Sequence, residues 1–126
     1  MARASRVLLV DDEPSIIKMV GKRLQVEGYQ LVIAMDGDEA LAKVKAERPD
    51  LIILDLMLPK KSGLDVCALL KDDEALRTIP VIAYTGRGQT MDELSRVCGA
   101  DALVHKGAGV DELMHQVKAL LPASNA

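Results

Sequence analysis

The chain has 126 residues, 49% of them hydrophobic and 28% charged, which is the size and composition of one globular domain. The net charge is −3 without a basic stripe, which argues against binding to the phosphate backbone of DNA or RNA, and the chain has only two aromatic residues on which bases could stack. We therefore expect no nucleic-acid partner. The apolar runs are far shorter than the roughly 20 residues needed to cross a bilayer, and no secretory leader precedes the first run, so we expect a cytoplasmic protein with no membrane partner.

Five short apolar runs have the character of buried strands. They are rich in leucine and β-branched residues, and polar residues bound them. The runs cover residues 7–10, 31–34, 51–54, 81–84 and 102–104.

Longer segments with apolar residues at helical spacing lie between and after these runs. The second helix stops before Pro49, the fourth begins at a capping box of Thr90 with Glu93, and the last ends at Pro122. The apolar faces that we expect to be buried on the first, third and last helices consist of Ile16, Ile17, Val20 and Leu24; Val66, Leu69 and Leu70; and Val110, Leu113, Met114, Val117, Leu120 and Leu121.

The regular alternation of strand and helix predicts a parallel sheet with helices on both faces. Five strands and five helices in a chain of this size favour the flavodoxin-like doubly wound α/β fold, with strand order 2-1-3-4-5. We expect one domain over residues 1–126, with a core from about 6 to 121 and a frayed tail at 122–126. In this fold, ligands bind beyond the carboxyl ends of strands 1 and 3.

Five polar residues lie just beyond the predicted strands: Asp11, Asp12, Asp55, Thr85 and Lys106. The predicted sheet brings them to one edge, where three carboxylates, a hydroxyl and an ammonium suit Mg²⁺ and a phosphoryl group. Taken singly, an aspartate there is more often a helix cap, a threonine a turn former and a lysine a solvated charge. Their joint placement in chain order points to a site.

Four motifs in order resemble the signatures of the receiver domain of bacterial two-component response regulators. They are Val-Leu-Leu-Val-Asp-Asp-Glu at 7–13, Leu-Ile-Ile-Leu-Asp-Leu-Met-Leu-Pro at 51–59 with Gly63, Pro-Val-Ile-Ala-Tyr-Thr-Gly at 80–86, and Gly-Ala-Asp at 99–101 followed by Lys106. The resemblance covers about residues 6–121 and is to chemotaxis-regulator-like single domains. It implies a phosphorylation-controlled signalling switch, not an enzyme of metabolic turnover.

By this resemblance, Asp55 accepts a phosphoryl group from a histidine kinase or a phosphotransfer protein. A carboxylate suits this role because it is already ionised at neutral pH and needs no general base. The resemblance also implies that Asp12 and Asp55 bind Mg²⁺ directly, Asp11 binds it through water, and Met57 binds it through the backbone carbonyl. Three carboxylates would otherwise repel one another, so we expect the metal to stabilise the fold.

The resemblance assigns the remaining phosphoryl contacts to the Lys106 ammonium, the Thr85 hydroxyl and the backbone N–H groups of Leu56 and Gly86. A small movement of Thr85 toward the phosphoryl group would change the surface formed by helix 4, strand 5 and helix 5. A downstream target protein would bind that changed surface.

The chain departs from the family pattern at two positions. Leu103 stands where receivers usually carry the tyrosine or phenylalanine that moves with the threonine, so the switch lacks that ring. Gly107 stands where proline usually follows the lysine, and two glycines make the loop at 106–109 more flexible. We expect this loop to be mobile without phosphate and ordered with it.

Two alternatives stay open at this point. A pseudo-receiver would keep the fold and act as a phosphate-independent interaction module, which Leu103 and Gly107 would suit. An aspartate-nucleophile phosphatase would carry a second acid two residues after the nucleophile, where this chain has Met57. We expect His105, His115 and the two cysteines to be structural. If the 126 residues are the full chain, we expect a single-domain regulator that acts by protein contact, because no output motif follows residue 121.

Overall fold

The structure is a computed structural model that describes residues 4–86 and 99–121. In chain order its elements are β1 (Arg6–Val10), α1 (Pro14–Val26), β2 (Gln30–Ala34), α2 (Gly37–Glu47), β3 (Leu51–Leu54), α3 (Gly63–Asp72), β4 (Val81–Thr85), β5 (Ala102–His105), the 3₁₀ helix η1 (Lys106–Ala108) and α5 (Val110–Leu120). The strand bounds agree with the predicted runs to within one residue. The expected helix at Thr90 and Glu93 lies outside the described residues.

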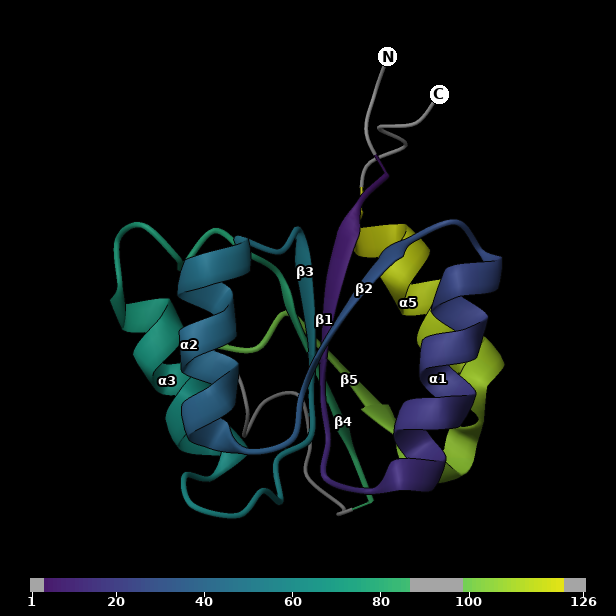
Figure 1. Cartoon of the computed structure of the whole chain (residues 1–126), viewed down its shortest axis with the longest axis horizontal. Helices are drawn as coiled ribbons and strands as arrows, with labels where there is room; N and C mark the ends of the chain where they lie inside the picture. Colours follow the sequence, from purple (N-terminus) through teal and green to yellow (C-terminus); the bar gives the residue numbers. More distant parts are fainter. Residues whose placement is uncertain (1–3, 87–98, 122–126) are drawn as a thin grey trace.

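The five strands form one parallel sheet in the order β2-β1-β3-β4-β5, which confirms the predicted flavodoxin-like topology. Figure 1 shows α2 and α3 together on one face of the sheet and α1 and α5 on the other. Because both faces are covered, the central strands are apolar on both sides, and every residue of β3 is buried. Each face has its own core of packed side chains.

Alternation along β1 shows how the two cores divide the strand residues. Leu8 and Val10 belong to the core beneath α2 and α3, whereas Val7 and Leu9 belong to the core beneath α1 and α5. Successive strand residues point to opposite faces, so one continuous apolar run supplies both cores.

The prediction that Leu69 is buried was wrong, because this side chain is 48% exposed. The buried positions of α3 include Val66, Cys67 and Leu70, which form a narrow stripe toward the sheet. Leu69 lies beside that stripe on the solvent face. Within the described parts of the chain, no helix has both the length and the apolar character needed to cross a membrane.

Helix starts fix the loops at the carboxyl edge of the sheet. The Asp36 side chain accepts a hydrogen bond from the N–H of Glu39 at the start of α2, and Ser62 does the same for Asp65 in α3. Pro14 begins α1, where its fixed φ suits the first turn and its missing N–H costs nothing.

Candidate functional site

The ends of β1 and β3 bring three aspartates together. Val10 and Leu54 are direct neighbours in the sheet, so the residues that follow them, Asp11 and Asp55, lie side by side. Carboxylate oxygens of Asp11, Asp12 and Asp55 lie within 4.8 Å of one another. Asp11 and Asp55 are buried, at 0% and 4% exposure, while Asp12 is exposed. Hard oxygen ligands at this spacing fit a divalent cation such as Mg²⁺.

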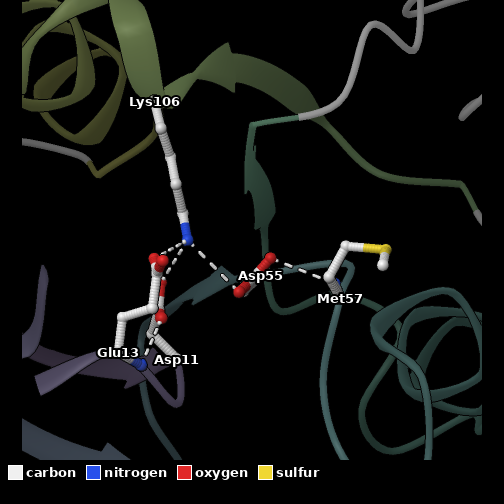
Figure 2. Close-up of polar contacts among 5 residues, drawn as sticks. All are labelled: Asp11, Glu13, Asp55, Met57 and Lys106. Carbon is white, nitrogen blue, oxygen red and sulfur yellow. Dashed lines mark hydrogen bonds and ion pairs between the residues drawn. The ribbon is translucent and has the colours of Figure 1, made fainter.

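Lys106 reaches into this cluster from η1, directly after β5. Figure 2 shows its ammonium among three carboxylates: Nζ lies 2.7 Å from Glu13 Oε2, 2.9 Å from Asp11 Oδ2 and 3.2 Å from Asp55 Oδ2. The buried atom Asp11 Oδ2 has no hydrogen-bond partner among the described residues, so its contact with Lys106 Nζ is an ion pair. The Lys106 side chain is 16% exposed, which contradicts the interpretation of this residue as a solvated charge.

The charges in this cluster influence one another strongly. Burial raises the pKa of Asp11, and the Asp55 charge raises it further, against the lowering effects of the Glu13 backbone N–H and of Lys106. Burial acts to lower the pKa of Lys106, but hydrogen bonds and charge attraction from Glu13, Asp11 and Asp55 outweigh it, and the pKa of Lys106 is raised. The lysine therefore stays an ammonium, while ionisation of Asp11 is costly in the absence of a metal.

The remaining predicted residues lie around the same edge of the sheet. Thr85 ends β4 and is fully buried, and Leu56 is buried after β3. The Met57 N–H donates a hydrogen bond to Asp55 Oδ1 at 3.0 Å, while the Met57 side chain is exposed. Gly86 lines a pocket of about 340 Å³ together with Asp12, Glu13, Asp55, Met57 and Lys106.

Leu103 lies on β5 beside Ala83 of β4. It is partly buried and packs against the core on the side of α2 and α3. Glu13 was not among the predicted site residues, although its carboxylate makes the shortest contact of the three with Lys106. Glu13 directly follows Asp11 and Asp12 after β1, and this run of three acids was the feature of the sequence that could have indicated its role.

Gly63 brings the start of α3 against the loop that holds Asp55. A Cβ atom at this position would lie 2.1 Å from the Asp55 carbonyl oxygen and 2.6 Å from the Leu56 Cα. The Gly63 N–H also donates to the Leu56 carbonyl oxygen at 3.2 Å. Both close atoms belong to the backbone, so no side-chain rotation can relieve the clash.

A Gly63→Ala substitution is therefore expected to destabilise the protein by about 3 kcal/mol or more, because it forces the backbone next to Asp55 to shift. Urea unfolding measures this loss. Gly107→Ala is the matched control, since a Cβ there meets no atom within 4 Å. Equal stabilities for the two variants would show that the close approach at Gly63 has no energetic consequence.

The raised pKa of Asp11 predicts how pH affects the metal-free protein. A carboxyl group whose pKa is higher in the folded state than in the unfolded state favours folding at low pH, and this contribution is lost as the pH rises from 3.8 through the folded pKa. Asp11→Asn removes the ionisation, so at neutral pH without metal the variant is expected to unfold at a higher temperature than the wild type. Thermal unfolding against pH measures the difference, and a lower midpoint at neutral pH would contradict it.

A family model for the response regulator receiver domain matches residues 7–118. The chain belongs to this family. Receiver domains of response regulators are phosphorylation-controlled signalling switches, and they are generally not metabolic enzymes.

Characterised relatives include transcriptional regulators. The chain is 41% identical over 117 residues to the DNA-binding dual master transcriptional regulator RpaA of Synechocystis, covering 92% of this chain and 48% of RpaA. It is 38% identical over 120 residues to the alkaline phosphatase synthesis regulatory protein PhoP of Bacillus subtilis, covering 94% of this chain and 49% of PhoP. The chain thus spans about half the length of the relatives it matches.

Solved structures with this fold include receivers of nearly the same length. The chemotaxis response regulator CheY4 of Vibrio cholerae aligns with a TM-score of 0.86 at 29% identity, over 94% of this chain and 99% of CheY4. The response regulator TrrA of Thermotoga maritima, solved in complex with Mg²⁺-BeF, aligns with a TM-score of 0.83 at 36% identity, over 93% of this chain and 99% of TrrA.

The prediction of no nucleic-acid partner was wrong for this group of proteins. RpaA is described as DNA-binding, and so is the regulator MtrA of Mycolicibacterium smegmatis, which is 40% identical to this chain over 117 residues. The prediction used the charge and aromatic content of 126 residues. Those quantities carry no information about the other half of the length of such regulators.

Proposed function

We propose that Asp55 is the phosphoacceptor of this receiver domain and that a histidine kinase or a phosphotransfer protein is the donor. The observation that carries this proposal is the position of the Asp55 carboxylate. Asp55 lines an open pocket, with two further aspartates within ligand distance and the Lys106 ammonium 3.2 Å from Oδ2. A nucleophile, metal ligands and a cation for the transferred group would thus be available at one point, which supports the proposal.

The chemistry follows from the charges. An oxygen of the Asp55 carboxylate forms a bond to phosphorus, the phosphorus–nitrogen bond of the donor phosphohistidine breaks, and the released imidazole nitrogen takes up a proton. The transition state carries charge on its equatorial oxygens, so positioning and neutralisation supply most of the catalysis. Met57 N–H and Lys106 hold the two carboxylate oxygens before reaction.

Asp12 and Asp55 would hold Mg²⁺ directly, with Asp11 acting through water and Met57 through its carbonyl oxygen. The ion would supply neutralisation of the developing negative charge. The convergence of three carboxylates within 4.8 Å supports this assignment, as does the Mg²⁺-BeF complex of the similar protein TrrA. Lys106, Thr85 and the backbone N–H groups of Leu56 and Gly86 would bind the phosphoryl oxygens.

The output of the switch would be a changed protein-binding surface around β5, α5 and the segment before β5. Thr85 and Leu103 lie on adjacent strands, where Thr85 pairs with His105 and Leu103 with Ala83, and a shift of Thr85 would reach Leu103 through the sheet. Leu103 packs as an aliphatic side chain against the core, and it would transmit that shift without an aromatic ring. A downstream target protein would bind the altered surface.

Intact-mass spectrometry after incubation with acetyl phosphate tests the proposal without knowledge of the partner kinase. We expect a gain of about 80 Da that requires Mg²⁺ and disappears when the metal is chelated. No gain in folded protein, beside a receiver that does react, would overturn the proposal in favour of a phosphate-independent interaction module.

A further inference from the structure

The Lys106 ammonium is paired with three carboxylates, and they differ in kind. Asp11 and Asp55 are buried and belong to the trio whose oxygens converge as potential metal ligands. Glu13 is 54% exposed and stands outside that trio, yet its Oε2 lies nearest to the ammonium, at 2.7 Å. Glu13 can therefore keep its contact with Lys106 when the oxygens of Asp11 and Asp55 bind a metal ion.

The backbone around Glu13 is fixed from both sides. Its N–H donates to Asp11 Oδ1 at 2.9 Å, and its carbonyl oxygen accepts hydrogen bonds from Ile16 and Ile17 at the start of α1. Glu13 also occupies the N-cap position of α1, with an extended backbone and no hydrogen bond between its side chain and the helix. The position of its Cα is therefore set by the same turn that places Asp11, and its side chain extends toward the Lys106 ammonium (Figure 2).

A divalent cation at the aspartates would compete directly with Lys106. It would draw on oxygens of Asp11 and Asp55, which now face the ammonium, and its charge would repel the ammonium. A lysine has a long, flexible side chain, and without another anchor it would move into solvent.

We propose that Glu13 is a positioning residue that holds the Lys106 ammonium beside the pocket while a divalent cation occupies the cluster of Asp11, Asp12 and Asp55. This inference rests on the proposed function for the presence of the cation, but the contact between Glu13 and Lys106 does not depend on it. Glu13 thus keeps the Lys106 ammonium close to the Asp55 carboxylate when the charge of the metal ion would otherwise displace the ammonium into solvent.

Lysine acetylation followed by peptide mass spectrometry tests this directly, with metal alone as the probe. In metal-free protein, Glu13→Gln is expected to raise the acetylation rate of Lys106 by about threefold, since one of its three carboxylate partners loses its charge. With saturating Mg²⁺, the wild-type rate is expected to change by less than about twofold, whereas the variant rate rises by about tenfold or more.

The chain offers two controls, a second lysine within each sample and a matched variant. Lys71 is 17% exposed and holds Asp101 on the opposite edge of the sheet, so its acetylation rate should be the same in all samples. Glu47→Gln removes a carboxylate that pairs with Arg6, remote from the site, and should leave Lys106 as slow as in the wild type.

Equal Lys106 rates in wild type and Glu13→Gln, with and without Mg²⁺, would overturn the inference. So would an equal release of Lys106 by Mg²⁺ in both proteins. A faster rate in the metal-free variant, with Mg²⁺ affecting neither protein, would leave Glu13 as the anchor of Lys106 and count against the proposed cation site instead.

A kinetic cycle gives a second readout. In Mg²⁺ and acetyl phosphate, Glu13→Gln is expected to slow phosphorylation by about three- to tenfold when Lys106 is present and by less than about twofold in a Lys106→Met background. The same slowing in both backgrounds would show that Glu13 acts through its own charge and not through the lysine.

Discussion

Asp55→Asn is expected to abolish the Mg²⁺-dependent gain of about 80 Da with acetyl phosphate, because a neutral amide has no anionic oxygen to attack phosphorus. Asparagine has nearly the same shape, and its side-chain oxygen can still accept the hydrogen bond from Met57 N–H. The fold should therefore persist. Intact-mass spectrometry and circular dichroism on the same sample separate loss of chemistry from loss of structure.

Asp65→Asn is the matched control for this experiment. Asp65 is an exposed aspartate in the first turn of α3, outside the acidic cluster, and its replacement should leave the mass gain as in the wild type. A full gain in Asp55→Asn would contradict the assignment of the phosphoacceptor and would transfer it to another side chain.

Lys106→Met is expected to destabilise the metal-free protein by about 2–3 kcal/mol and to make its stability depend strongly on Mg²⁺. Removal of the ammonium leaves the buried carboxylates of Asp11 and Asp55 next to each other without a cation. Added Mg²⁺ should restore most of the loss because it supplies the missing positive charge. Urea unfolding with chelator and with Mg²⁺ measures both quantities.

Lys71→Met provides a strict comparison. Lys71 has nearly the same exposure, and it also joins separate segments, with Nζ bonded to Asp101 and to the carbonyl oxygens of Arg77 and Ile79. This variant should lose stability equally in chelator and in Mg²⁺. An equal loss in both solutions for Lys106→Met as well would show that Lys106 is structural and does not share the carboxylates with a metal.

The architecture could be predicted because its signals are local and repeated. Strands buried on both faces require continuous apolar runs, and each run was found to within one residue. The parallel arrangement then placed Asp11 beside Asp55 without any knowledge of side-chain contacts, since Val10 and Leu54 share a register. Backbone topology alone was enough for that part of the site.

Side-chain contacts across the site could not be predicted in the same way. Lys106 and Glu13 are 93 residues apart, and both carry long side chains whose direction no sequence period fixes. Leu69 shows the same difficulty on a smaller scale, because a position at the margin of a helical stripe can face either the core or solvent. The prediction of no nucleic-acid partner failed for a different reason. The net charge of these 126 residues says nothing about the rest of the length of the DNA-binding relatives.

The role of Asp55 as phosphoacceptor is tested most directly by locating the phosphoryl group in the wild-type chain. Borohydride reduces an acyl phosphate on aspartate to homoserine, which peptide sequencing by tandem mass spectrometry assigns to one position. We expect homoserine at position 55 after treatment with Mg²⁺ and acetyl phosphate, with Asp11 and Asp12 unchanged. Homoserine at another aspartate, or a phosphoryl group retained on a serine or threonine, would contradict it.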